Sequence, residues 1–336
     1  MRLAKHLPIL LLASTLPLAA LAAACGGDDS SGDGDGTVDP DGTNHTYAIS
    51  KVSVPSNGTE ATQLGLDIDE KPNDANGGID NQLGMVLGNI GALAPDLHIQ
   101  TSIDEQVDQG GIILLANVVA KDLTNASGVG LAVYQGENPR PAPCTDANDT
   151  VCRHHLDGTG MFDVAADSRP AQLAGKIVAG KFSGGPGTVT LSIALSAGMP
   201  IDLPLQKAKA ELSGISATGI TSGKIGGAIA KADLETKVYP AIAATIRATY
   251  DRDCPMTPER TIANGCNCAA GTTGKTLQTT FDKTPPDCMI SDSEVVGFVS
   301  GLVSPDIDLD GDGMADAVSL GVGVQAVAGA FTPPTN

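Results

Sequence analysis

Alternation of apolar residues with polar or small residues, strict from Val189 to Ser196 and resumed in two runs up to Leu212, is the pattern that most limits the fold of this chain. Every second residue from Val189 to Leu195 is apolar, with Thr, Ser and Ala between them. After the Ala-Gly-Met sequence at 197–199, Ile201, Leu203 and Leu205 alternate with polar or Pro residues, and a second alternating run follows at Ala208, Ala210 and Leu212. Because side chains on one face of a strand recur with a period of two, these segments predict a β-hairpin with one apolar and one solvent-facing surface.

Other segments predict further strands and short helices. Gly, Pro and Asn separate apolar runs that are typical of strands, at 111–120, 128–134, 161–165 and 171–182. Apolar residues at helical spacing predict short helices at 83–93, 97–107 and 292–302.

One longer helix is predicted where apolar residues recur every four positions, at Leu234, Val238, Ile242 and Ile246. Pro240 lies within this stripe, so we expect a kink there or two abutting helices. Together these elements predict a mainly β (α+β) fold. It would be a single antiparallel, meander-like sheet domain with one kinked helix and a disulfide-stapled insertion.

The charge of the chain excludes one class of function. The 336 residues include 20 Lys and Arg against 39 Asp and Glu, a formal net charge of −19. Such a chain is repelled by a phosphate backbone, so we do not expect it to bind nucleic acid. Hydrophobic residues make up 41% of the sequence, which is enough apolar surface for a folded core.

The N-terminal residues 1–24 have the organisation of a signal peptide. Arg2 and Lys5 precede an apolar run from Leu7 to Leu18, and small residues follow at 22–24. The apolar run is too short to span a bilayer, and no later segment has enough consecutive apolar residues to do so. The sequence therefore predicts export.

The sequence Leu-Ala-Ala-Ala-Cys at 21–25 resembles the lipobox of bacterial lipoproteins, in which the cysteine is acylated. It differs from the family pattern in having Ala22, rather than Leu, three residues before Cys25. The resemblance implies a lipid that anchors the protein in the outer membrane or at the cell surface. Cleavage after Ala24 without acylation would instead leave a soluble periplasmic or secreted protein. Residues 25–45, rich in Asp and Gly, predict a disordered tether, followed by a single β-rich domain at 46–336.

Cysteine parity agrees with acylation of Cys25, because the other six of the seven cysteines form an even set. Cys144 and Cys152 are close enough in sequence to staple a loop. A Pro-, Gly- and Thr-rich insertion holds the remaining four, whose three pairings the sequence leaves open, although a bond between neighbours Cys266 and Cys268 is sterically disfavoured. Zinc binding or a redox role is an alternative for this group, but export favours disulfides. These four are Cys254, Cys266, Cys268 and Cys288.

A loop at 306–319 carries the clearest chemical motif. Counting Asp308 as position 1, carboxylates occur at positions 1, 3, 5 and 9 and Gly313 at position 6. Ca²⁺ takes about six or more oxygen ligands, and alternating Asp residues in a tight turn supply several from one short segment. The expected ligands are the side chains of Asp308, Asp310, Asp312 and Asp316 and the backbone carbonyl of Met314.

This loop resembles the calcium loops of EF-hands, dockerins and thrombospondin type 3 repeats. Ser319 stands at position 12, where an EF-hand has a bidentate Glu, and the residues from Val318 to Val327 are typical of a strand. The resemblance therefore implies a single strand-flanked loop with the affinity of extracellular calcium modules, a Kd of about 10⁻⁴–10⁻³ M.

A second, looser version of the motif occurs near the start of the body. Its Asn-Gly-x-x-Asp spacing repeats that of Asp312, Gly313 and Asp316. A polar turn is the alternative to a second calcium site. The expected ligands here are Asp67, Asp69, Asp74, Asn76 and Asp80. The acidic leader, the two Asp-rich loops and the Ala- and Gly-rich sheet together resemble uncharacterised lipoproteins of myxobacterial type, a resemblance that implies no activity.

No nucleophile elbow, zinc-protease, phosphate-binding or dinucleotide motif occurs in the sequence. Metal binding at the adjacent pair His154 and His155 remains an alternative, and His98 stands alone. Acid pairs such as Asp104/Glu105 and Asp251/Asp253 occur in any acidic protein. We therefore expect a non-catalytic, calcium-stabilised cell-surface or envelope lipoprotein with an interaction or structural role. The alternatives are a carrier of hydrophobic molecules and a secreted hydrolase whose site is assembled from scattered residues. The sequence does not say whether the partner is a protein or an apolar small molecule.

Overall fold

A computed structural model of the chain describes residues 36–71, 77–94, 97–194, 200–283 and 285–334. The strands are β1 (Thr43–Ser53), β2 (Leu114–Ala120), β3 (Ala126–Arg140), β4 (Met161–Val164), β5 (Leu173–Val178), β6 (Lys181–Ile193), β7 (Ile201–Ser216), β8 (Gly219–Ala230) and β9 (Ala317–Ala328). The predicted signal peptide, Cys25, most of the predicted tether and the turn at 197–199 lie outside the described residues.

Helices occupy two connections between strands. The first, between β1 and β2, holds α1 (Gly58–Leu64), α2 (Gln82–Leu93) and α3 (Ile99–Asp108). The second, between β8 and β9, holds α4 (Lys231–Asp233), the π-helix η3 (Leu234–Val238), α5 (Tyr239–Asp253), the 3-10 helix η4 (Ile262–Asn267), α6 (Thr273–Phe281) and α7 (Asp292–Leu302). A short 3-10 helix, η2 (His154–Leu156), lies between β3 and β4.

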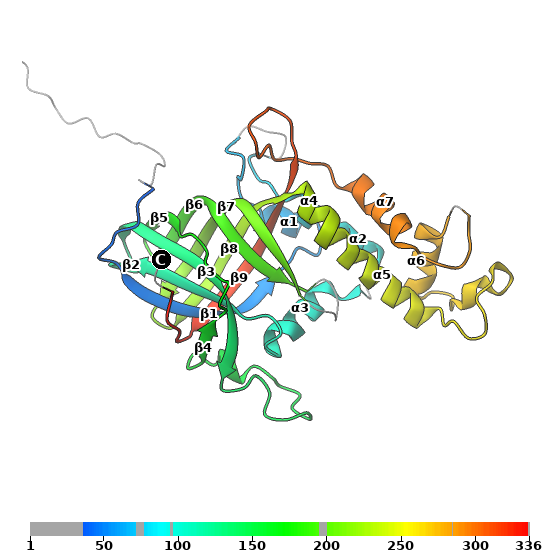
Figure 1. The fold of residues 1–336 in the computed structure, drawn as a ribbon, viewed down its shortest axis with the longest axis horizontal. Helices are drawn as coiled ribbons and strands as arrows, with labels where there is room; N and C mark the ends of the chain where they lie inside the picture. The colour runs from blue at the N-terminus through cyan, green and yellow to red at the C-terminus, as the bar shows by residue number, and fades with distance from the viewer. Residues whose placement is uncertain (1–35, 72–76, 95–96, 195–199, 284, 335–336) are drawn as a thin grey trace, which may run out of the picture. The chain divides into compact units, whose positions relative to one another are not determined.

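The strands form one antiparallel sheet in the order β2-β1-β9-β8-β7-β6-β5-β3-β4. Because β2 also pairs with β3, the first eight strands of this order close into a barrel, and β4 is added to it along β3 (Figure 1). The first described strand, β1, lies between β2 and the last strand, β9, so the first and last strands along the chain meet there and the barrel is closed.

Alternation along the strands places the core inside the barrel. Directly paired residues share a face, and the register carries one apolar face from strand to strand around the barrel. The hydroxyl of Tyr47 on β1 donates to the carbonyl of Ser216 on β7 at 2.9 Å. Buried side chains on this inner face include Tyr47, Val133, Leu173, Phe182, Leu191, Leu205, Ile225 and Val322.

The two helical connections add to the same core. Helix α2 packs against β9 and α3 against β1, while α5 packs against α6 and α7. Both groups lie to the right of the barrel in Figure 1. Their apolar faces, with Leu87, Ile103, Ile246 and Val299 among the buried residues, belong to the same apolar cluster as the barrel interior.

The prediction of a mainly β fold is confirmed, but the prediction of a single meander-like sheet is wrong. Strands pair in chain order except at β4, which is added along β3, so that β3 pairs with β5. The long-range pairing of β1 with β9 then closes the sheet on itself. The alternation of residues within a strand does not report such a pairing. More than one helix is also present among the described residues, because both long connections are helical.

The predicted interruption of the helix at 234–246 takes the form of a π-helical turn. Residues Leu234–Val238 are π-helical, and α5 starts at Tyr239 with Pro240 in its first turn. The helix runs without a break from α4 through η3 into α5, so the π-helical turn directly before Pro240 is where the ladder of hydrogen bonds adjusts to the missing N–H of the proline.

Phe182 tests the assignment of the inner face. Its side chain is 1% exposed in the barrel, and removing a buried aromatic side chain costs about 3–5 kcal/mol. We expect Phe182→Ala to lower the free energy of unfolding in urea by that amount. Val178→Ala on neighbouring β5, where the side chain is 56% exposed, should change it by less than about 0.5 kcal/mol. Equal effects of the two substitutions would contradict the assignment.

Candidate functional site

The loop that precedes β9 brings three of the predicted ligands together. A bridge between Ile307 and Ala317 closes its base. Gly311 and Gly313 turn the chain within it at φ values of 81° and 90°, which favour glycine. One carboxylate oxygen from each of Asp308, Asp310 and Asp312 lies within 4.8 Å of the others.

Backbone amides hold these carboxylates in place. Asp308 accepts hydrogen bonds from the amides of Gly311 at 2.7 Å and Gly313 at 2.9 Å. These two bonds lower the pKa of Asp308, with a smaller contribution from the charge of Lys207. Asp312 accepts a bond from the amide of Met314 at 2.8 Å. The loop thus keeps Asp308 ionised.

Asp316, the fourth predicted carboxylate ligand, stands outside this group of three. Its carboxylate accepts a hydrogen bond from the amide of Leu309 at 2.8 Å, across the base of the loop. Met314 is 68% exposed. This exposure is compatible with the predicted role, in which only its backbone carbonyl would be a ligand.

The second predicted loop gathers Asp67, Asp69 and Asp80 in the same way, with one oxygen of each within 4.8 Å of the others. A bridge between Leu66 and Asp80 closes its base. Asp74 and Asn76, the other two predicted ligands, lie outside the described residues. Lys71 pairs with Asp69 at 2.8 Å, so a cation of the chain itself already contacts this group.

Asp80 is only 3% exposed, and this burial raises its pKa. The charges of Asp69 and Asp306 raise it further. Hydrogen bonds from the amides of Ile68, at 2.7 Å, and Asp69, at 3.2 Å, act in the opposite direction.

The side chains of Asn81, which the sequence did not single out, and of Ser319 join the two loops. The side chain of Asn81 accepts from the amide of Gly321 at 2.8 Å and donates to its carbonyl at 3.0 Å. The hydroxyl of Ser319 accepts from the amide of Gln82 at 2.8 Å and donates to Asp306. Figure 1 shows the loop before β9 beside the loop after α1. We use the name aspartate seam for residues 66–71, 77–84 and 306–321.

Negative charge exceeds positive charge in the aspartate seam. Lys209 on β7 donates to the carbonyl of Asp67 at 2.6 Å and pairs with Glu70 at 3.1 Å. Lys207 donates to the carbonyl of Asp308. With Lys71, these make three ammonium groups against nine described carboxylates. The nine are Asp67, Asp69, Glu70, Asp80, Asp306, Asp308, Asp310, Asp312 and Asp316.

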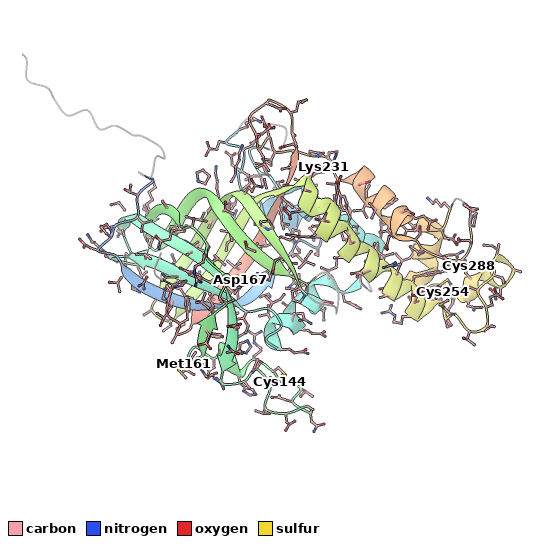
Figure 2. All side chains as sticks on the ribbon, viewed as in Figure 1. Cys144, Met161, Asp167, Lys231, Cys254 and Cys288 are labelled. Carbon is pink, nitrogen blue, oxygen red and sulfur yellow. A yellow bond between two sulfur atoms is a disulfide. The ribbon has the colours of Figure 1, made fainter. Side chains whose placement is uncertain are left out.

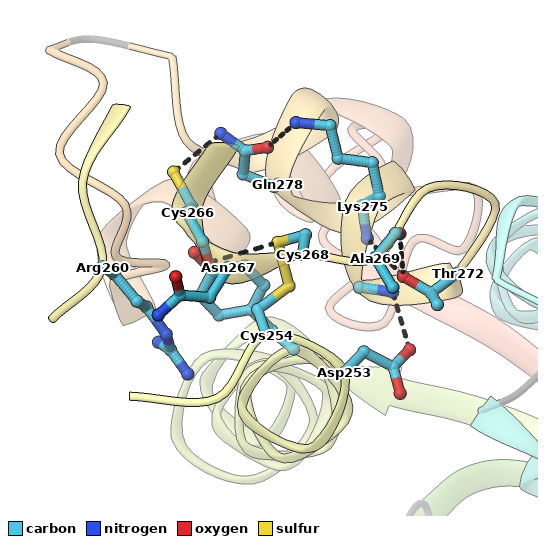
Figure 3. The surroundings of a disulfide bond; sticks show 12 residues. Asp253, Cys254, Arg260, Cys266, Asn267, Cys268, Ala269, Thr272, Lys275 and Gln278 are labelled. Carbon is cyan, nitrogen blue, oxygen red and sulfur yellow. Dashed lines mark hydrogen bonds between the residues drawn. A yellow bond between two sulfur atoms is a disulfide. The ribbon is translucent and has the colours of Figure 1, made fainter. Parts of the chain in front are cut away.

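All six cysteines of the body form disulfides, as parity predicts. Cys144 pairs with Cys152. Of the pairings left open by the sequence, the structure has Cys254 with Cys268 and Cys266 with Cys288. Figure 3 shows the Cys254–Cys268 bond at the end of α5, where Asp253 also accepts a bond from the amide of Gly274 on α6 at 2.8 Å. Sulfurs bonded in this way offer no thiolate to zinc.

The histidines and acid pairs that a hydrolase could use have other partners. His154 contacts Asp149 at 3.0 Å. Asp104 accepts from the side chain of Gln100, and Asp251 pairs with Arg260. Among the described residues that line it, the cavity beside His98, of about 300 Å³, has no acidic side chain.

No protein-family model, curated protein or solved structure matches this chain. Among the described residues, no helix combines the length and the apolar character needed to cross a membrane.

His155 makes stability depend on pH. It is 1% exposed, and burial lowers its pKa below the usual 6.5, helped by the charges of Arg153 and His154 and opposed by a hydrogen bond to the backbone of Val107. Below pH 6.5 the unfolded chain therefore binds more protons at this position than the native state does, and stability falls.

We expect the free energy of unfolding in urea to fall between about pH 7 and pH 5.5, and to fall less steeply in His155→Gln. The exposed His98→Gln is the control and should keep the slope of the wild type. An unchanged slope in His155→Gln would contradict this account.

Proposed function

We propose that this chain is a non-catalytic lipoprotein of the cell envelope or cell surface, stabilised by calcium and used for interaction or structure. The observation that carries the proposal is the approach of Asp308, Asp310 and Asp312 to within 4.8 Å of one another in the loop that begins β9. Their order and spacing along the chain are those of calcium loops in exported proteins.

The chemistry of this group fits calcium better than a softer metal. Every side-chain donor in it is a carboxylate oxygen, the ligand that Ca²⁺ prefers, and the predicted carbonyl of Met314 is also a hard oxygen ligand. Three carboxylates this close repel one another, so a divalent cation between them relieves a cost that the seam's lysines only partly offset. The group at Asp67, Asp69 and Asp80 is the proposed second, weaker site.

A structural role for calcium follows from the position of the loop. Its base joins directly to β9, which pairs with β1 and β8 in the barrel wall. Ser319, at position 12 of the motif, is buried and bonded to Asp306. It therefore links the loop to β9. A cation bound by the loop carboxylates would hold the loop in this conformation and so stabilise the barrel at the aspartate seam.

The described residues favour a structural or interaction role over catalysis or transport inside the barrel. The inner face of the barrel is filled by large buried side chains such as Tyr47 and Phe182, which support a packed core. Of the residues considered for a hydrolase, His154, Asp104 and Asp251 are paired with Asp149, Gln100 and Arg260 respectively. Envelope location and acylation of Cys25 rest on the leader sequence.

Calcium should raise the thermal stability of the folded chain. With a Kd of about 0.2 mM, within the range of extracellular sites, about 2 mM Ca²⁺ stabilises the native state by about 1.4 kcal/mol per site. For a chain of this size the melting temperature should rise by about 2–4 °C relative to EDTA, and less with Mg²⁺. Differential scanning calorimetry measures this.

Asp312→Asn should abolish most of the rise, because it removes a ligand charge but keeps the acceptor for Met314. Asp146→Asn is the matched control: Asp146 also caps an exposed turn, accepting from the amide of Asn148 at 2.7 Å. No rise in the wild type, or equal loss in both variants, would refute the calcium proposal.

Acylation of Cys25 should determine where the protein is found. In an acylating bacterial host we expect the wild type to fractionate with membranes and to partition into the detergent phase of Triton X-114. Cys25→Ser should move it to the soluble fraction, since the signal peptide remains but the acylated thiol is lost. A wild type that is already soluble would support cleavage without lipid and overturn the anchor.

A further inference from the structure

A cavity of about 480 Å³ lies on the outside of the barrel, where β4 meets the C-terminal segment. Figure 2 marks this region by Met161 on β4 and Asp167 in the turn that follows. Two of its lining residues offer apolar surface. Met161 is 50% exposed, and the partly exposed Phe331 packs edge-on against Tyr134 at 5.8 Å between ring centroids.

The charged side chains of this cavity are of the opposite sign to the chain as a whole. Arg140, Arg169 and Asp163 all line it, so its described lining residues carry a formal charge of +1 on a chain of −19. Arg140 is committed to Asp163, with its two terminal nitrogens 3.2 and 2.8 Å from the two carboxylate oxygens.

Arg169 is different, because it has no carboxylate partner among the described residues. One terminal nitrogen donates to the carbonyl of Ser168 at 2.9 Å, which leaves other guanidinium donors for a ligand.

The backbone that carries Arg169 is held to the barrel. The hydroxyl of Ser168 accepts from the amide of Gln135 on β3 at 2.9 Å, and the amide of Ala165 donates to the carbonyl of Gln135 at 2.9 Å. On the other wall, the amide of Phe162 donates to the carbonyl of Ala330 at 2.9 Å, which fixes β4 against the C-terminal segment. Walls fixed in this way need little reorganisation when a ligand binds.

We propose that this cavity binds a small organic acid, with one carboxylate on Arg169 and an apolar body on Met161 and Phe331. A planar guanidinium matches a carboxylate and is weakly hydrated, so it tolerates apolar neighbours. A formal charge of +1 matches one negative charge, and the volume falls within the range of small-molecule sites. This inference rests on the cavity alone and does not depend on calcium binding.

The test compares 2-naphthoate with the isosteric neutral 2-naphthamide, each followed by its own fluorescence anisotropy. The chain has no tryptophan, so the protein contributes little emission in the same range. We expect naphthoate to bind the full chain at least about tenfold more tightly than naphthamide, the difference expected for a hydrogen bond to a charged group.

Three variants assign the site. Arg169→Gln should weaken naphthoate binding by about tenfold or more and leave naphthamide unchanged. Asp163→Asn should strengthen naphthoate binding, because it removes the one negative charge and frees Arg140. Arg247→Gln is the charge-matched control, since Arg247 lies on α5 and pairs with Asp292 at 2.8 Å; it should bind as the wild type does.

Failure of naphthoate to bind the wild type, or equal binding of the two probes, would overturn the proposal. Equal losses in Arg169→Gln and Arg247→Gln would do the same, because they would reduce the effect to net charge. Asp163→Asn is expected to raise the affinity for naphthoate, whereas Arg169→Gln is expected to lower it. A variant that failed to fold would lose affinity, so a gain in Asp163→Asn cannot come from misfolding.

Discussion

The pairing of β1 with β9 is the constraint on which the rest of the structure depends. It places the first described strand beside the last and, with the β2–β3 pairing, gives every barrel strand two partners and leaves no free edge among them. The same pairing explains the aspartate seam. One Asp-rich loop follows β1 and α1 and the other precedes β9, so joining these strands brings the loops together although Asn81 and Gly321 are 240 residues apart.

Charge and hydrogen bonding oppose each other in the aspartate seam. Asn81 is 5% exposed. Its side-chain amide bonds to both the N–H and the carbonyl of Gly321, as the backbone of a neighbouring strand would. Buried bonds of this kind hold the loops against the repulsion between their carboxylates, because losing one partner would leave a buried polar group unsatisfied. Burial raises the pKa of Asp306 and of Asp80, which shows that the environment already disfavours added negative charge. A cation bound at the exposed carboxylates would reduce the repulsion between them.

Sequence reasoning succeeded where a pattern is local and failed where pairing is distant. Alternation identified β7 and the second half of β6, and apolar spacing identified α2, α3 and α7 nearly to the residue. The strand predicted at 171–182 joined β5 to the start of β6. Both β1 and β8 were missed. Glycines obscure the pattern in β8; a Cβ at Gly227 would lie 2.8 Å from that of Leu205, so packing requires the glycine. The first residues of β1 were assigned to the tether, because an Asp-rich segment precedes them. Spacing singled out three carboxylates that lie together in the structure, those of Asp308, Asp310 and Asp312, whereas Asn81 and Lys209 gave no local signal.

Hydrogen exchange with and without Ca²⁺ reports which segments of the chain binding stabilises. We expect Ca²⁺ to slow amide exchange at 306–319 and, through Asn81, at 81–84. Exchange in the disulfide loop between Cys144 and Cys152 should not change. Unchanged exchange at 306–319, or equal slowing in both regions, would contradict a calcium site that stabilises the barrel at the aspartate seam.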